Sequence, residues 1–383
     1  LAGQGLMSFA AFLSTVVLAN HVSKHDLGDF RLVVSIYTTL TFFVMSGLSA
    51  AFIRSIVQGY DGALEEALEI KKRYGLLTFL IGACISLYFL YKGNDVFALL
   101  VIIMAVFLPI TEMYSMYVPY LQGKHEFKYS SLNTGIVKVL SSAAVIAITF
   151  IYPTTVWLVI AFFGAQALVT FIQYKLLIQK FPPENTKRDT NMLPHAKHLT
   201  LSGVGFLFFG QIDKYILYHF FGPVALASYW IASSIPQEFG RVVSTIGQVA
   251  FPKFVGIDHE KSKDMLAKRF VSALLILFML SLLYAVIAYP FFHVFFNDYI
   301  SEVPKSIFLM FGLAIIPYYF IWGYYTAKAN HKVTYFLNIV DPTLQVVLYL
   351  ICIPFFGIWG LVGAVCLKTS IMNMLAWYIL KKY

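Results

Sequence analysis

Long apolar stretches separated by short polar loops run along the whole chain. A helix that crosses a membrane needs about 20 predominantly apolar residues, and about twelve windows of this kind follow one another. They cover residues 1–20, 30–53, 74–91, 96–118, 131–151, 154–174, 199–221, 229–252, 270–290, 305–327, 335–353 and 358–380. The pattern predicts an all-α, polytopic membrane protein.

The longest polar break, residues 175–198, divides these windows into two sets of six. Weak self-similarity relates the sets, because aligning Phe30 with Tyr229 also places Ala51-Phe52 opposite Ala250-Phe251. Internal repeats of this kind are common in transporters. We therefore expect two pseudo-symmetric six-helix lobes, residues 1–180 and 199–383, joined by a cytoplasmic linker at 181–198.

Composition supports a membrane protein and offers no sign of covalent chemistry. Hydrophobic residues make up 59% of the chain and charged residues 12%, whereas a soluble domain is about one quarter charged. The cysteines Cys84, Cys352 and Cys366 each lie in an apolar run, which indicates packing rather than disulfides or a metal site. Phosphate-binding loops, HExxH, Cys-x-x-Cys and nucleophile-elbow motifs are missing from the sequence. We expect no enzyme activity, no metal and no cofactor.

The basic residues are distributed on alternate loops. They concentrate in residues 54–73, 124–128, 175–197, 253–269, 328–332 and 381–382, whereas the intervening loops hold only Lys24, Lys92 and Lys305. Basic loops face the cytoplasm, so we expect both termini to be cytoplasmic and the protein to lie in a bacterial inner membrane. The net charge of +9 then reflects topology and contact with anionic membrane lipids, and nucleic acid is not an expected partner.

Several charged residues fall inside the apolar windows. The cations are Arg31, Lys138, Lys214, Arg241 and Lys368, and the acids are Glu112, Asp213, Glu238 and Asp341. A charge that faces lipid at the bilayer centre costs roughly 3 kcal/mol. These side chains are therefore expected to face a polar cavity or one another.

The window at 229–252 carries the most continuous polar stripe. Ser234, Glu238, Arg241, Thr245 and Gln248 follow one another at helical steps of three and four and share one face. Arg241 and Glu238 have two interpretations, either contact with substrate and a coupling ion or simple neutralisation of one another.

The other deep charges also have alternative interpretations. Lys214 and Lys368 either contact the substrate or pair with a hidden acid, and Asp213 either couples a cation or pairs with a lysine of an adjacent helix. Arg31 and Lys138 either line the cavity or extend to the headgroups. Glu112 is interpreted as an interface residue, and Asp341 as a cap before Pro342.

Glycine-rich and apolar motifs give the chain a resemblance to a known family. They are Leu27-Gly28-Asp29-Phe30, Ser46-Gly47-Leu48-Ser49-Ala50-Ala51-Phe52-Ile53-Arg54, Asp213-Lys214-Tyr215-Ile216-Leu217, Phe221-Gly222-Pro223-Val224-Ala225-Leu226-Ala227-Ser228-Tyr229 and Gly357-Ile358-Trp359-Gly360-Leu361-Val362-Gly363-Ala364. In order and spacing the chain resembles the polysaccharide or oligosaccharide flippases (Wzx type) of the multidrug/oligosaccharidyl-lipid/polysaccharide (MOP) exporter superfamily. Leu226 departs from the pattern, because such proteins often have glycine there.

The resemblance implies a MATE-like, V-shaped pair of lobes that works by alternating access. The implied substrate is an undecaprenyl-diphosphate-linked oligosaccharide repeat unit for surface polysaccharide such as O-antigen, capsule or exopolysaccharide. The resemblance also implies transport driven by protons or sodium, with other polysaccharide-assembly membrane proteins as candidate partners. The candidate residues for diphosphate contact are Arg241, Lys214, Lys368, Lys138 and Arg31, since lysine and arginine bind phosphate, and those for ion coupling are Asp213 and Glu238.

Two other functions remain open at this stage. A multidrug or other small-molecule exporter of the same superfamily would share the fold but favour acidic residues in its cavity. A membrane glycan polymerase or ligase would normally carry a large outer loop, whereas the longest outer loop here is only about residues 291–304.

Overall fold

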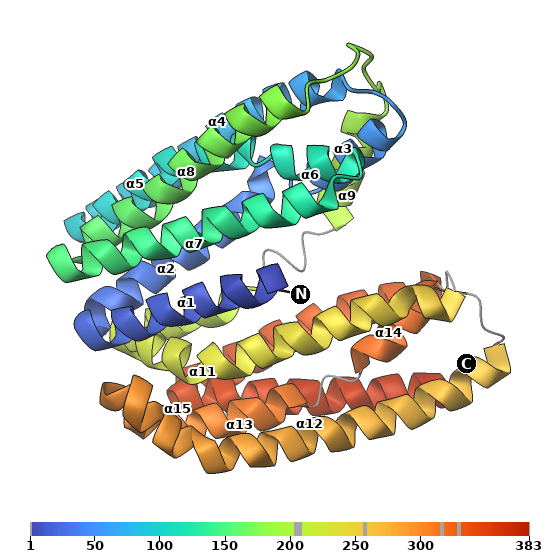
Figure 1. The fold of residues 1–383 in the computed structure, drawn as a ribbon. Coiled ribbons are helices and arrows are strands. Elements are labelled where there is room, and N and C mark those ends of the chain that lie inside the picture. Colours follow the sequence, from blue (N-terminus) through green and yellow to red (C-terminus); the bar gives the residue numbers. More distant parts are fainter. Residues whose placement is uncertain (1, 203–208, 256–258, 315–317, 328–330, 383) are drawn as a thin grey trace. The chain divides into compact units, whose positions relative to one another are not determined.

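The computed structural model describes residues 2–202, 209–255, 259–314, 318–327 and 331–382, and within these ranges it contains helices and no strand (Figure 1). The chain divides into two compact units, unit 1 at residues 1–211 and unit 2 at residues 212–383. The all-α prediction is confirmed. The lobe and linker limits at 180 and 198 stay a prediction, and by packing the division falls after Gln211.

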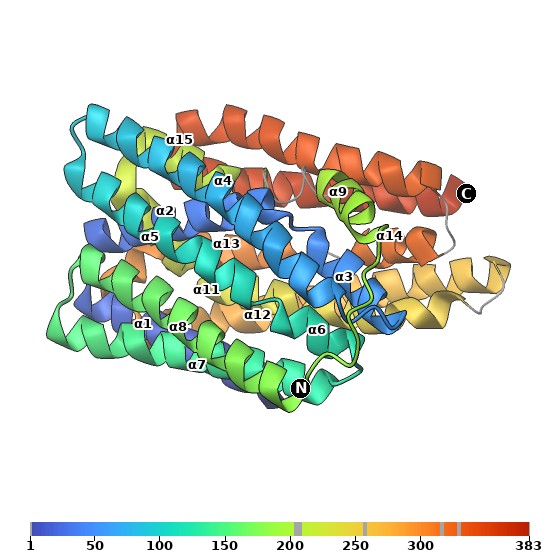
Figure 2. The same ribbon diagram turned by 90° about the horizontal axis from the view of Figure 1, so that it is seen from above.

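Unit 1 is a bundle of long helices with shorter helices at one end (Figure 1). Its elements are α1 (Ala2–His21), α2 (Lys24–Leu40), the 3-10 helix η1 (Thr41–Val44), α3 (Leu48–Val57), α4 (Ala63–Tyr91), α5 (Asp95–Tyr114), α6 (Tyr117–Gly123), α7 (Phe127–Ile151), α8 (Thr155–Lys180) and α9 (Met192–Ser202). Helix α5 packs between α4 and α8, and α7 packs between α8 and α1 (Figure 2).

Unit 2 contains two long elements that glycine divides. Its elements are α11 (Ile212–Val255), α12 (His259–Phe295), the 3-10 helix η2 (Asn297–Glu302), α13 (Val303–Ala314), α14 (Tyr318–Ala327) and α15 (His331–Lys382). Helix α11 breaks at Gly222 (φ 75°) and α15 at Gly357 (φ 56°). Only glycine adopts positive φ readily, so these two residues let each element turn between two predicted membrane windows.

Seven of the described helices are long and apolar enough to cross a membrane by length and composition. They include α4, α7, α8 and the apolar part of α12, and α15 is long enough to supply two crossings on either side of Gly357. The multi-pass prediction is therefore confirmed, with about twelve as an approximate number of crossings.

Three predicted window limits need correction. The window at 30–53 is interrupted, because η1 and Met45 (φ 59°) separate α2 from α3. The window at 96–118 is interrupted between α5 and α6. Helix α4 begins at Ala63 rather than Tyr74. Lys71, expected in a loop, consequently lies inside this helix and is 2% exposed.

Tertiary packing gives the reason for the first interruption. A Cβ atom on Gly47 would lie 2.5 Å from the backbone nitrogen of Thr200 and 2.7 Å from the carbonyl oxygen of Ala196. The Gly47 N–H donates a hydrogen bond to Thr200 Oγ1 at 3.0 Å. Helix α9 therefore lies directly against the bend that begins α3, and the sequence of residues 30–53 alone carries no sign of it.

The segment before α9 is also fixed to unit 1. Asp61, which is 1% exposed, accepts hydrogen bonds from the Glu184 N–H at 2.6 Å and from Lys124 Nζ at 2.9 Å. Ser55 Oγ donates to the buried Asp189 at 2.8 Å. Residues 184–189 thus dock onto the loop between α3 and α4 and the end of α6.

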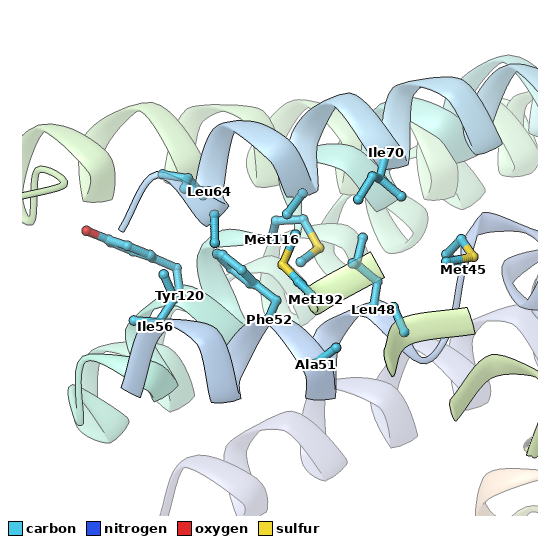
Figure 3. Packing of buried hydrophobic residues seen from close by; sticks show 13 residues of the cluster. Met45, Leu48, Ala51, Phe52, Ile56, Leu64, Ile70, Met116, Tyr120 and Met192 are labelled. Atoms are coloured by element: carbon cyan, nitrogen blue, oxygen red, sulfur yellow. The ribbon is translucent and has the colours of Figure 1, made fainter. Parts of the chain in front are cut away.

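An apolar cluster beneath this segment completes the docking (Figure 3). Met192 and Ala196 of α9 pack against Phe52 of α3, Ile70 of α4 and Tyr120 of α6, all less than one tenth exposed. Burying apolar side chains of this size contributes about 2 kcal/mol each. The predicted linker is therefore an ordered part of unit 1 as far as Ser202.

Candidate functional site

The paired charges of α15 form the first part of the candidate site. Lys368 Nζ lies 3.0 Å from Asp341 Oδ1 and 2.8 Å from Gln345 Oε1. The two charged residues stand on opposite sides of the Gly357 break, so the turn at this glycine brings the two halves of α15 together. The hidden acid considered for Lys368 is thus present, and it is Asp341.

The cap interpretation of Asp341 is wrong. Helix α15 begins at His331, well before Asp341, so this carboxylate is not at a helix N-terminus. Its oxygen also accepts a hydrogen bond from the Tyr318 hydroxyl at 3.3 Å, and the Tyr318 N–H donates to Asn373 Oδ1 at 3.0 Å. Asp341, in the first half of α15, therefore contacts both α14, through Tyr318, and the second half of α15, through Lys368.

Asp213 forms the second part, in α11. Its side chain is 8% exposed and accepts a hydrogen bond from the Tyr229 hydroxyl at 3.1 Å. Lys214 Nζ lies at the longer distance of 3.5 Å from Asp213 Oδ1. The pairing alternative for Asp213 named a lysine of an adjacent helix, whereas the lysine found near it is the next residue in the chain.

Tyr349 relates the two acids to one another. This tyrosine of α15 is 5% exposed, and it lies within electrostatic range of both Asp213 and Asp341. Because α11 packs against α15, the two aspartate sites belong to one polar region inside unit 2. We call this region, consisting of Asp213, Lys214, Tyr229, Tyr318, Asp341, Gln345, Tyr349 and Lys368, the unit 2 polar cluster.

The sequence showed the charges of this cluster but not its tyrosines. Tyr318, Tyr229 and Tyr349 are three of 25 tyrosines in the chain, and nothing in their local sequence separates them from tyrosines that lie at the membrane interface. Gln345 was also missed. Its position four residues after Asp341 places both on one helix face, which was an available signal.

The remaining candidates of unit 2 lie on the second half of α11. Glu238 is half-buried, and the preceding residue, Gln237, donates a hydrogen bond to Ser233 Oγ at 3.0 Å. The side chains of residues 241–265 lie outside the part of the chain whose side chains are described. Arg241, Thr245 and Gln248 are among them, so pairing of Arg241 with Glu238 stays a prediction.

The deep charges of unit 1 fall in three different places. Glu112 Oε2 of α5 lies 3.0 Å from Lys71 Nζ of α4, and the two side chains are 20% and 3% exposed. The Arg31 guanidinium lies 5.6 Å from the ring centre of Phe30 on α2. Lys138 is exposed on α7. These groups lie on four helices of unit 1, namely α2, α4, α5 and α7.

Comparison with known proteins identifies the family. The family described as polysaccharide biosynthesis protein matches residues 1–258. The chain belongs to this family. A curated relative, an uncharacterized membrane protein of Methanocaldococcus jannaschii, is 23% identical over 91% of this chain and 76% of its own length.

Solved structures of flippases and exporters share the fold of this family member. The lipid II flippase MurJ in an inward closed conformation superposes with a TM-score of 0.77 at 14% identity, covering 100% of this chain and 87% of MurJ. An inward-facing MATE transporter of the MOP superfamily gives 0.71 at 15% identity, covering 98% and 94%. A MOP superfamily transporter from Pyrococcus furiosus superposes with a TM-score of 0.62 at 15% identity, covering 99% of this chain and 93% of the transporter. The MATE-like fold that the resemblance implied is therefore confirmed.

Proposed function

We propose that this protein is a flippase that moves polyisoprenyl-diphosphate-linked oligosaccharides, such as undecaprenyl-diphosphate repeat units, from the cytoplasmic to the outer leaflet of the inner membrane. The observation that carries the proposal is the unit 2 polar cluster, where Lys368 and Lys214 have side chains only 14% and 22% exposed. Lysine ammonium groups bind phosphate as point charges, and the diphosphate is the anionic part of such a lipid. The polysaccharide biosynthesis family supports the same substrate class.

We further propose that transport proceeds by alternating access and that Asp213 and Glu238 take part in coupling to a proton or sodium gradient. Asp213 is suited to this role because it is a buried carboxylate that contacts Tyr229 and Lys214. Intramembrane acids that pair with other groups commonly mark ion pathways. Arg241, Lys138 and Arg31 remain candidate substrate contacts.

A flipping assay tests the proposal directly. Purified protein in proteoliposomes receives a polyisoprenyl-diphosphate oligosaccharide with a labelled sugar, and an impermeant glycosidase measures the fraction that reaches the outer leaflet. We expect Lys368→Ala to slow this transfer about tenfold, as loss of one charged hydrogen bond would do. Lys332→Ala is the matched control, because Lys332 is an exposed lysine on the same helix and its loss should leave the rate unchanged.

A multidrug exporter is the second candidate, since a MATE transporter shares the fold at a TM-score of 0.71. The same proteoliposomes can be loaded with a cationic dye for an efflux measurement. Efflux of the dye without transfer of the lipid-linked sugar, under either direction of the ion gradient, would replace the flippase proposal with this one.

A further inference from the structure

The two aspartates of the unit 2 polar cluster have neighbours of the same two kinds, a lysine and a tyrosine. Asp341 contacts the ammonium of Lys368 at 3.0 Å and the hydroxyl of Tyr318 at 3.3 Å. Asp213 contacts the ammonium of Lys214 at 3.5 Å and the hydroxyl of Tyr229 at 3.1 Å. Each carboxylate is thus held by one charged donor and by one neutral donor. The pattern occurs twice, on different helices.

The charged donor has capacity for another ligand. A lysine ammonium has three hydrogen-bond donors and no acceptor. Lys368 donates one hydrogen bond to Gln345 Oε1 and forms an ion pair with Asp341 Oδ1. The side chains of Lys368 and Asp341 are 14% and 21% exposed, so a ligand can approach the pair. A phosphate oxygen can therefore meet Lys368 before the contact with Asp341 breaks.

We propose that Lys368 and Lys214 exchange partners during transport. Each lysine leaves its aspartate and binds a phosphate oxygen of the substrate instead. The hydroxyls of Tyr318 and Tyr229 stay hydrogen-bonded to the two aspartates. This inference rests on the proposed flippase function. The exchange needs no covalent step. The neutral phenol donors matter because a buried carboxylate left without any partner is strongly unfavourable.

The two kinds of partner have opposite effects on substrate affinity. Asp341 competes with the phosphate for Lys368, and its negative charge also repels the phosphate. Tyr318 favours substrate binding, because its hydrogen bond stabilises the carboxylate after Lys368 has left. The competition keeps the anion from binding too tightly to be released, as a transport site requires.

The experiment measures binding to the purified full chain in detergent by titration calorimetry. Farnesyl diphosphate serves as a soluble polyisoprenyl diphosphate, and farnesol as the same chain without charge. We expect Asp341→Asn to bind the diphosphate about tenfold more tightly and Tyr318→Phe about tenfold more weakly, as expected for one charged hydrogen bond. Lys368→Ala should lose the preference for the diphosphate over farnesol.

Matched controls come from exposed residues of unit 2. Asp298→Asn in η2 and Tyr335→Phe in α15 make the same chemical changes at exposed positions, and they should leave the affinity unchanged. If Asp341→Asn does not fold, as judged by its unfolding midpoint, Asp213→Asn and Tyr229→Phe provide the same comparison at the second aspartate.

The possible results separate this inference from the proposed function. Weaker binding in both the asparagine and the phenylalanine variants would overturn the exchange and leave the aspartates as structural partners, while the flippase proposal would stand. Equal affinity of the wild-type protein for farnesyl diphosphate and farnesol would contradict both, because neither lysine would then recognise phosphate.

Discussion

Asp61 and Lys124 form an ion pair with 2.9 Å between Oδ2 and Nζ, and the Asp61 side chain is only 2% exposed. Glu184 approaches the same lysine at 3.0 Å, but its side chain is 80% exposed. The buried acid and the exposed acid therefore make unequal contributions. A surface pair contributes at most about 1 kcal/mol, whereas breaking a buried pair costs about 3 kcal/mol.

Removing Asp61 should release the segment that docks on it. The exposed residues Lys187 and Arg188 are trypsin sites, and we expect rapid cleavage there in Asp61→Ala but not in the wild-type protein. Limited trypsinolysis of purified protein, read as two fragments of similar size on a gel, checks this. Glu184→Ala is the control and should resist cleavage like the wild type. Rapid cleavage of the wild type would contradict the docked arrangement.

The same docking should weaken in strongly alkaline solution. Burial lowers the pKa of Lys124, but its hydrogen bonds to Asp61 and Glu184 outweigh this effect, and the net pKa lies above the ordinary value of 10.5. A raised pKa means that the stabilisation is fully present below 10.5 and is lost as pH rises through the higher folded value. The resistance of the bond after Lys187 to proteolysis should therefore be constant from neutral pH to about pH 10. A protease that is active over that range measures it.

The pair formed by the buried Lys71 and the half-buried Glu112 should show coupled effects on stability. Glu112→Ala leaves an ammonium buried without its acid, so the free energy of unfolding should fall by about 3 kcal/mol. Combining Lys71→Met with Glu112→Leu should recover most of this loss, because no unpaired charge remains. Unfolding midpoints in detergent check both. Lys72→Met, an exposed lysine on the same helix, should change stability by less than about 0.5 kcal/mol.

Gly47 should not tolerate a methyl group. Its Cβ would lie 2.5 Å from the backbone of α9, so Gly47→Ala must displace α9 from the bend before α3. We expect a clear loss of thermal stability, of about 2 kcal/mol. Gly363→Ala has open space at its Cβ position within α15 and should be neutral or slightly stabilising. Equal midpoints for the two variants would contradict the close packing of α9.

Transport by single and double variants of Arg241 and Glu238 should show whether the two residues act as a pair. If Arg241 contacts the substrate diphosphate, Arg241→Lys keeps partial transport and Arg241→Ala retains very little, because lysine restores the charge but not the planar fork. Combining Arg241→Ala with Glu238→Ala should then remain inactive. Flipping rates at matched protein levels check this. Recovery of transport in the double variant would show that the two residues only neutralise each other.

The predicted orientation can be tested with single cysteines in a variant that lacks the three native ones. Thr190→Cys should react with an impermeant reagent only from the cytoplasm, and Asn94→Cys and Asp298→Cys only from outside, because basic loops face inward. All three positions are exposed. Asp61 is unsuitable as a probe because it is buried. Labelling of residue 190 in intact cells would reverse the topology.

The sequence by itself determined the class of protein and the approximate positions of its helices. Hydropathy is a sum over neighbouring residues, so windows such as 131–151 and 154–174 agree closely with α7 and α8. The sequence also located the deep charges, because a charged residue inside an apolar window can be recognised without knowing which group it contacts. Glycines 222 and 357 stood in motifs that sequence reasoning had already marked.

The tertiary structure alone decided which groups meet. Asp341 and Lys368 lie on two halves of α15 that turn at Gly357, and the contact of Gly47 with Thr200 joins distant parts of unit 1. Such contacts depend on how complete helices pack, and local sequence does not encode the partner of a residue. For the same physical reason, the cap interpretation of Asp341 and the loop position of Lys71 were wrong. Local sequence showed neither that Lys368 pairs with Asp341 nor that the half-buried Glu112 pairs with Lys71 inside the bundle.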